Sequence, residues 1–204
     1  MKPLRDLYDW VLSWSEKRFG GVALFFLALA ESVIFPIPPD VLLIALVLGH
    51  RASAFKFAAI CSAGSLLGGM LGYSLGQFAW LTADGFTPLA QFFFTHVPGF
   101  TEAVYSEAGR RFDQFGFEII FSAGFTPIPY KIFTIAAGAF DVNFPVFVVA
   151  SAISRTARFF LVAGLIWKFG PPIKSFIDKY FNLLAIAFTV LLVGGFIAVK
   201  YLLA

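Results

Sequence analysis

Apolar residues form long segments along most of the chain, and polar residues are largely confined to short stretches between them. Three segments, at 54–81, 143–169 and 180–204, are continuous and longer than the ~20 residues that cross the ~30 Å hydrocarbon core of a bilayer. They are predicted to be membrane-spanning helices. Two further segments, at 19–49 and 116–140, are each cut near the middle by prolines and a charged residue, which excludes one straight helix.

The two interruptions are similar in sequence. They read Pro36-Ile37-Pro38-Pro39-Asp40 and Pro127-Ile128-Pro129-Tyr130-Lys131. As helices, the arms 21–35 and 41–49 would be about 22 Å and about 14 Å long, so neither spans alone, whereas one kinked span of roughly 40 Å or more needs steep tilt. We therefore predict two re-entrant hairpins, because non-helical backbone at membrane depth must be buried in protein or line a wet cavity. The predicted hinges are Pro36, Pro38, Pro39, Pro127 and Pro129.

Recurrence of this motif indicates an internal repeat. The shift that superposes the two Pro-Ile-Pro triplets places Asp40 on Lys131, and each broken segment precedes a continuous span. If the hairpins enter from opposite faces, the repeats are inverted, as in many secondary transporters with a site at mid-membrane. Chance recurrence of a short triplet is the alternative. The predicted fold class is an all-α integral membrane protein with two opposed re-entrant helical hairpins in an inverted repeat, three membrane-spanning helices and an N-terminal interfacial helix.

Two helices are predicted at the membrane surface. Charged and apolar residues alternate over 1–18 at near-helical spacing, which predicts an amphipathic interfacial helix, with a polar leader as the alternative. In the polar stretch between the repeats, Thr101 and Glu102 are typical of a helix start and Gly116 of its end. A second interfacial helix is therefore predicted at 101–115.

Composition agrees with a membrane protein and excludes several other classes. Hydrophobic residues make up 59% of the 204 residues and charged residues 13%, against about 25% charged in soluble domains. Cys61 is the one cysteine, so no disulfide forms within the chain, and His50 and His96 lack zinc-site spacing. No motif indicates an enzyme, a metal or a cofactor. The cations flank apolar segments, which indicates a cytoplasmic N-terminus and no nucleic-acid partner.

Five charged residues fall within the predicted membrane segments. Arg155 and Arg158 lie near the centre of a span and on one helix face, where each costs about 2.5–3.5 kcal/mol or more unless it is paired or faces a polar cavity. A guanidinium favours a carboxylate or a phosphate. Glu31 and Asp40 are candidates for static ion pairing or, because a carboxylate removed from water can take up a proton, for proton coupling. With Lys131 the group has one surplus positive charge, which favours an anionic ligand.

The span at 54–81 carries a glycine at every fourth position, namely Gly64, Gly68, Gly72 and Gly76. A smooth glycine face lets a neighbouring helix approach closely. These glycines are predicted to serve helix packing, either within one chain or between two copies in a homo-oligomer.

Four stretches of the chain form a recognisable combination: Glu31–Asp40, the glycine-rich Gly64–Gly76, Gly124–Lys131 and Ala136–Ala139. Together they resemble the DedA family, whose domain is also called VTT or SNARE-associated, and in particular its YqaA-type branch. The resemblance implies a transport domain at 19–170, with two opposed re-entrant hairpins, in the bacterial inner (plasma) membrane. It also implies movement of lipids such as undecaprenyl phosphate or phosphatidylethanolamine between leaflets, in some members driven by the proton-motive force.

The chain departs from the family pattern around the second hairpin. The family's arginine before the Phe-x-Pro motif is Gly124 here, and its arginine after the proline is Tyr130. Lys131 follows one residue later, and Arg155 and Arg158 on the next helix are candidates to supply the missing charge. Specificity for a polyprenyl phosphate is therefore not implied by the resemblance alone.

The leading expectation is a lipid translocase whose partners are membrane lipids. An anionic or zwitterionic head group would meet Arg155, Arg158 and Lys131. Glu31 and Asp40 match the family's functional acidic pair by motif order, and protonation of either would couple the step. Two alternatives stay open: a proton-coupled antiporter or exporter of a small solute, and a non-transporting membrane scaffold whose buried charges pair with each other.

Overall fold

The computed structural model describes residues 14, 19–82, 85–97, 101–126, 129–170 and 172. Most of these residues are helical, as the hydrophobic segments predict. The predicted interfacial helix at 1–18, apart from Trp14, and the predicted span at 180–204 lie outside the described residues.

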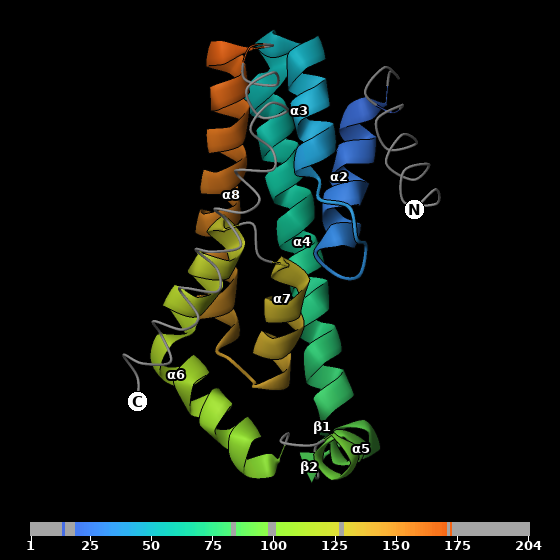
Figure 1. Ribbon diagram of the computed structural model, residues 1–204, viewed down its shortest axis with the longest axis vertical. Coiled ribbons are helices and arrows are strands. Elements are labelled where there is room, and N and C mark those ends of the chain that lie inside the picture. The colour runs from blue at the N-terminus through green and yellow to red at the C-terminus, as the bar shows by residue number, and fades with distance from the viewer. Residues whose placement is uncertain are drawn as a thin grey trace.

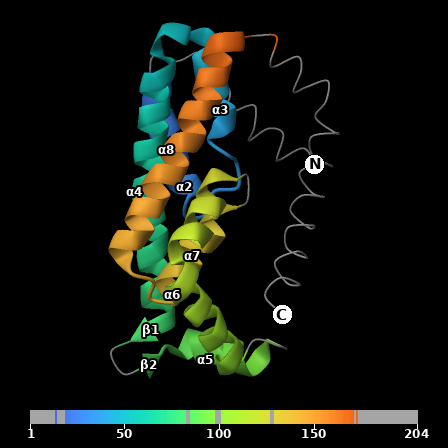
Figure 2. The same cartoon turned by 90° about the vertical axis from the view of Figure 1, so that its left-hand side faces the viewer.

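Two long helices form the frame of the structure. Helix α4 covers Ala54–Trp80 and helix α8 covers Phe144–Phe169, each about 40 Å long at 1.5 Å per residue. Both are long and apolar enough to cross a membrane, and they run in opposite directions (Figures 1 and 2). Helix α8 begins where the Asn143 side chain accepts a hydrogen bond from the Val146 amide, with Pro145 in the first turn. Both predicted segments are thus confirmed as long helices.

The first broken segment consists of two short helices. Helix α2 covers Gly20–Glu31 and helix α3 covers Asp40–Gly49, and residues 32–39 between them are not helical. The break falls where the prolines gather, because proline lacks an amide hydrogen and clashes with the preceding helical turn. Asp40 opens α3, where a carboxylate is stabilised by the helix dipole. The chain reverses between the two helices (Figure 1).

The second broken segment is built differently at its start. Helix α6 covers Glu102–Phe125 and is followed by helix α7, Tyr130–Ala139. The side chain of Thr101 caps α6, as predicted. The predicted end of the first helix at Gly116 agrees with the structure. The backbone leaves helical geometry at Phe115, with φ −125° and ψ 25°, and two helical segments meet there at a kink.

Short elements close the ends of the long helices. A 3-10 turn η2, Arg51–Ser53, precedes α4, and strands β1, Leu81–Thr82, and β2, Gly85–Phe86, pair antiparallel after it. Helix α5 covers Pro88–His96 and starts at Thr87, whose side chain caps it. These elements were not predicted, because each is too short to show a hydrophobic period.

The two broken segments approach one another from opposite ends of the structure. In Figures 1 and 2, α2 and α3 occupy the end where α4 begins and α8 ends, and the second half of α6 with α7 comes from the other end. Their interruptions lie at similar height, near the middle of α4 and α8. Helix α4 packs against both α2 and α7, and α8 packs against α4 and α6.

Gly64 and Gly68 of α4 pack against the backbone of α2. A Cβ atom built on Gly64 would overlap the backbone carbonyl oxygen of Phe25, and one on Gly68 would overlap that of Leu29. The two helix backbones are therefore as close as the absence of these side chains permits.

Gly72 and Gly76 of the same helix pack against α7. A Cβ atom on Gly72 would overlap the Thr134 hydroxyl, and one on Gly76 would overlap the Ile135 carbonyl oxygen. One glycine stripe on α4 thus packs against helices of both broken segments, and these close approaches lie within a single chain.

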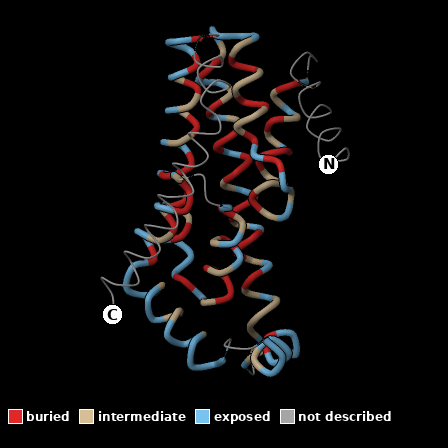
Figure 3. The backbone as a smooth tube through the Cα atoms, viewed as in Figure 1, coloured by how far each residue is buried: buried red, intermediate tan, exposed pale blue. Residues whose placement is uncertain are grey.

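Another face of α4 is apolar and exposed. Figure 3 shows buried residues where the helices face one another and exposed residues on their outer sides. The exposed positions on α4 include Leu67, Leu71, Leu75 and Phe78. Small residues inside and large apolar residues outside are the reverse of the usual distribution in a water-soluble domain.

Replacing Gly76 with alanine is expected to destabilise the protein by about 1–3 kcal/mol, because the new methyl group must displace backbone of α7. Gly164 on α8 is the matched control, since a Cβ there would meet only the Phe55 ring, at 3.9 Å. Gly164→Ala is expected to be neutral or slightly stabilising. Thermal unfolding in detergent compares the two variants, and equal midpoints would contradict the packing described for α4 and α7.

Candidate functional site

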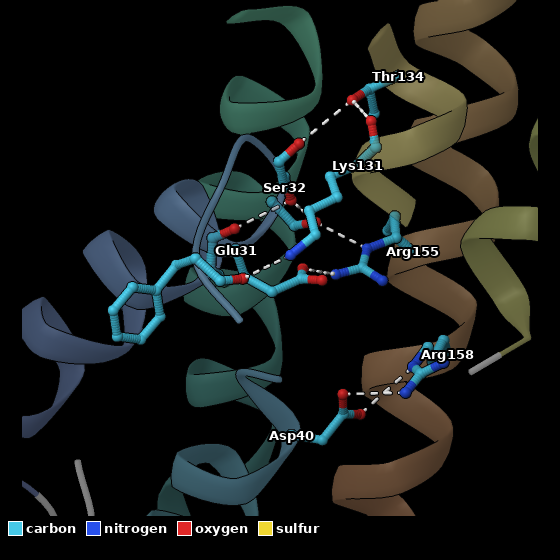
Figure 4. A network of polar contacts seen from close by, with 10 residues as sticks. Glu31, Ser32, Asp40, Lys131, Thr134, Arg155 and Arg158 are labelled. Carbon is cyan, nitrogen blue, oxygen red and sulfur yellow. Dashed lines mark hydrogen bonds and ion pairs between the residues drawn. The ribbon is translucent and has the colours of Figure 1, made fainter. Parts of the chain in front are cut away.

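A small charged cavity lies where the two helix interruptions meet α8. Its volume is about 230 Å³. The lining residues come from both interruptions and from α8: Glu31, Pro36, Pro38, Pro39, Asp40, Pro129, Lys131, Arg155 and Arg158. Figure 4 shows the charged side chains pointing toward one another from these elements. We call this space the charged cavity.

Arg155 forms the buried side of the charged cavity. Its guanidinium donates from Nη2 to Glu31 Oε2 at 3.1 Å and from Nε to Ser65 Oγ at 2.7 Å. It also lies over the rings of Tyr130 and Phe159, 4.7 and 4.6 Å from the centroids. Arg155 is only 3% exposed, so the ion pair with Glu31 is shielded from solvent and the guanidinium is held on all sides.

Arg158 lies one turn further along α8 and holds Asp40. The two groups form a bidentate pair, with Nε to Oδ1 at 3.3 Å and Nη2 to Oδ2 at 2.9 Å. Both side chains are about one sixth exposed, at 16% and 15%, and so are more accessible than the pair at Arg155. The sequence left open which acid pairs with which arginine. In the structure Glu31, at the end of α2, pairs with Arg155, and Asp40, at the start of α3, pairs with Arg158.

Lys131 supplies a third cation to the charged cavity. Its Nζ donates to the backbone carbonyl oxygens of Phe35, at 3.2 Å, and Ile34, at 3.4 Å, across the gap between the two interruptions. Among the described residues, no carboxylate lies within ion-pair distance of Lys131. The charged cavity therefore has three cations and two carboxylates, and Lys131 carries the surplus charge.

Hydroxyl groups connect the charged cavity to the helix-packing interface. Ser65 Oγ, which accepts from Arg155, is 2.9 Å from Ser32 Oγ, and Thr134 Oγ1 donates to the Ser32 carbonyl oxygen at 3.2 Å. Sequence reasoning did not assign these residues a role. The available signal was a serine inside an apolar span, because polar groups at membrane depth need partners.

Most residues singled out from the sequence meet at the charged cavity. Glu31, Asp40, Lys131, Arg155 and Arg158 all line it, together with the described hinge prolines. Pro127, the remaining predicted hinge, lies outside the described residues. The four glycines of α4 that were predicted to serve packing do not line it and instead pack against α2 and α7. Within the described ranges, no group of three or more histidine, cysteine or acidic residues could hold a metal ion.

Comparison with known proteins places the chain among bacterial relatives. An uncharacterized protein from Haemophilus influenzae is 36% identical over 200 residues, which cover 98% of this chain and all of that protein. The chain belongs to the same family as that protein. A second uncharacterized protein, from Histophilus somni, is 36% identical over 166 residues, covering 81% of this chain and 82% of the relative. No family model and no solved structure matches. The family is thus established, and the function is inferred from the geometry of the charged cavity.

Proposed function

We propose that this protein is a multi-pass membrane protein of the DedA type that translocates a lipid between the leaflets of the inner membrane. The observation that carries the proposal is the charged cavity, with its surplus cation, at the meeting point of two helix interruptions. A cavity of this kind inside an otherwise apolar bundle suits the phosphate of a lipid head group.

The outer surface supports a position in a bilayer. Helices α4 and α8 are long enough to cross the hydrocarbon core, and their exposed residues are largely apolar. In this setting the two broken segments are re-entrant hairpins that enter from opposite faces, as in an inverted repeat. Their non-helical backbone then faces the charged cavity and protein, as a membrane environment requires.

The size of the charged cavity supports entry of the head group alone. A volume of about 230 Å³ is below the roughly 300–1,000 Å³ of pockets that enclose a drug-sized ligand. The phosphate would occupy the cavity while the hydrocarbon chains stay in the bilayer. Lys131 is the first contact in this proposal. Its ammonium group donates only to backbone carbonyl oxygens among the described residues, so a phosphate can bind it without displacing one of the carboxylates described in the cavity.

The two ion pairs provide a route to coupling. A phosphate that binds Arg158 must displace Asp40 from the bidentate pair. Protonation of Asp40 or Glu31 would remove the competing negative charge and free the arginine for the lipid. If the acid is open to one side of the membrane before lipid translocation and to the other side afterwards, each translocation would carry a proton down its gradient.

The departures from the DedA pattern are compatible with this proposal. At Gly124, where the family has an arginine, a Cβ atom would overlap the Ser154 hydroxyl and lie 3.5 Å from Cδ of Arg155. The space beside Gly124 is thus already filled by the side chain of Ser154, and the side chain of Arg155 lies next to it. Arg155 from α8 can therefore supply, from the neighbouring helix, the charge that the second hairpin lacks.

Two further candidate functions each have an observation in their favour. The small volume of the charged cavity would also suit a small anion, which favours a proton-coupled exporter. The pairing of both arginines with carboxylates favours a scaffold whose charges only stabilise the fold. The experiment below separates the three.

Leaflet-to-leaflet movement of labelled polyprenyl phosphate and of labelled phosphatidylethanolamine is measured in proteoliposomes that contain the full chain. Release of a trapped soluble anion is measured in parallel, each with and without a pH gradient. We expect at least one lipid to move faster than in protein-free vesicles, and the gradient to change its rate. Anion release without lipid movement would identify an exporter. Neither activity, in protein with an intact unfolding transition, would favour the scaffold and refute translocation.

A further inference from the structure

A second cavity, separate from the charged cavity, opens at the outer end of the first hairpin. Its volume is about 670 Å³, and it lies between the start of α2, the end of α3 and the start of α4. The lining residues are Phe19, Gly20, Gly21, Val22, Phe25, Leu46, His50, Ser53, Lys56, Phe57 and Ile60. We call it the end cavity.

The end cavity is amphiphilic. Its polar side chains are the exposed Lys56 and His50 and the half-buried Ser53, which follow one another around the turn that joins α3 to α4. The ring of Phe57 lies edge-on to His50, at 6.5 Å between centroids, and the other walls are apolar. Among the described residues that line it there is no carboxylate, so this part of the polar rim is cationic and donor-rich.

We propose that the end cavity binds an anionic phospholipid, with the phosphate on Lys56 and Ser53 and one hydrocarbon chain against Phe25, Phe57 and Ile60. The proposal rests on the proposed function, since it assumes a bilayer around the protein, and deepens it by naming where a lipid docks. A lysine at the end of an apolar helix lies at head-group depth, where it attracts anionic lipid.

An adjoining apolar cavity extends from this position along α2. It has a volume of about 360 Å³ and shares Phe19 and Val22 with the end cavity. It follows one face of α2 as far as Ala30, and it also touches Phe35 beyond the end of that helix. These last two residues directly precede Glu31 and Pro36, which line the charged cavity. A lipid docked at the end cavity therefore lies beside an apolar surface that leads toward the proposed translocation site.

Lipid binding to the full chain in detergent, measured by native mass spectrometry, tests the docking site. Phosphatidylglycerol and phosphatidylcholine are added in equal amounts, and Lys56→Gln is compared with Lys168→Gln. Lys168 is the matched control, because it is exposed on the last turn of α8 at the same end and does not line the end cavity. We expect Lys56→Gln to lose about fivefold in phosphatidylglycerol binding, which corresponds to one lysine near the membrane surface, and Lys168→Gln to bind like the parent.

Two further arms keep the result specific. Glycerol phosphate, which lacks a hydrocarbon chain, is expected not to displace the bound lipid, and Arg110→Gln is expected to bind like the parent because Arg110 is exposed on α6 and lines neither cavity. Equal loss in Lys56→Gln and Lys168→Gln, equal binding of the two lipids by the parent, or displacement by glycerol phosphate would overturn the proposal. Since no transport is measured, such a failure leaves the proposed translocation to its own test.

Discussion

Replacing Arg155 with methionine is expected to lower the free energy of unfolding by about 3–5 kcal/mol. The change leaves the Glu31 carboxylate buried without its partner and removes the donor to Ser65. It also removes a cation that lies over two aromatic rings. Unfolding of the full chain in mixed detergent micelles, followed by tryptophan fluorescence, measures the loss.

A double variant separates the uncompensated charge from the lost contacts. Glu31→Gln combined with Arg155→Met removes both charges, and we expect it to recover most of the stability, since a buried ion pair contributes little over neutral replacements. Arg110→Met is the surface control, because Arg110 is 74% exposed in its pair with Glu107 and should cost no more than about 1 kcal/mol. If Arg155→Met were as stable as Arg110→Met, the buried pair described for α2 and α8 would be wrong.

Replacing Lys131 with glutamine is expected to slow lipid movement by about tenfold or more while changing stability little. The substitution removes the one surplus cation of the charged cavity, and a hydrogen bond to a charged group is worth about 1.5–3 kcal/mol. The folded state loses only contacts with two backbone carbonyl oxygens, which a glutamine amide can also make. Initial rates in proteoliposomes, at matched protein density, measure the effect.

Lys131→Arg is the conservative control for this prediction. It keeps the positive charge, and we expect it to retain most of the rate. Arg110→Gln, which removes an exposed cation far from the charged cavity, should behave like the parent. A parental rate in Lys131→Gln would show that the surplus charge does not attract the head group, and it would contradict the role proposed for Lys131.

Local chemistry explains why the breaks in the helices were predictable. Clustered prolines end a helix wherever they occur, so the gap between α2 and α3 follows from Pro36, Pro38 and Pro39 without any tertiary information. The start of α6 at Thr101 follows in the same way from its cap. The kink of α6 at Phe115 falls beside Gly116, as predicted, because a glycine is compatible with a helix end or a bend.

The residues of the candidate site could be predicted from the sequence, but which of them contact one another could not. Charges in apolar segments must find partners, which pointed to the five residues that line the charged cavity. Which acid meets which arginine depends on how far α2 and α3 slide along α8, and that is set by the glycine contacts of α4 with its neighbours. The contact of Lys131 with the carbonyl oxygens of the first interruption is likewise a tertiary feature with no local signal.

The central claim is that a lipid head group enters the charged cavity, and a photoreactive lipid tests it most directly. A phospholipid with a diazirine beside its phosphate is reconstituted with the full chain, irradiated, and the crosslinked peptides are identified by mass spectrometry. A lipid with the diazirine at the chain end is the control, expected to label the exposed face of α4 at Leu67 and Leu71. We predict head-group crosslinks in residues 31–40 and at Lys131. Head-group crosslinks confined to the two ends of the long helices would contradict the proposed entry of the lipid.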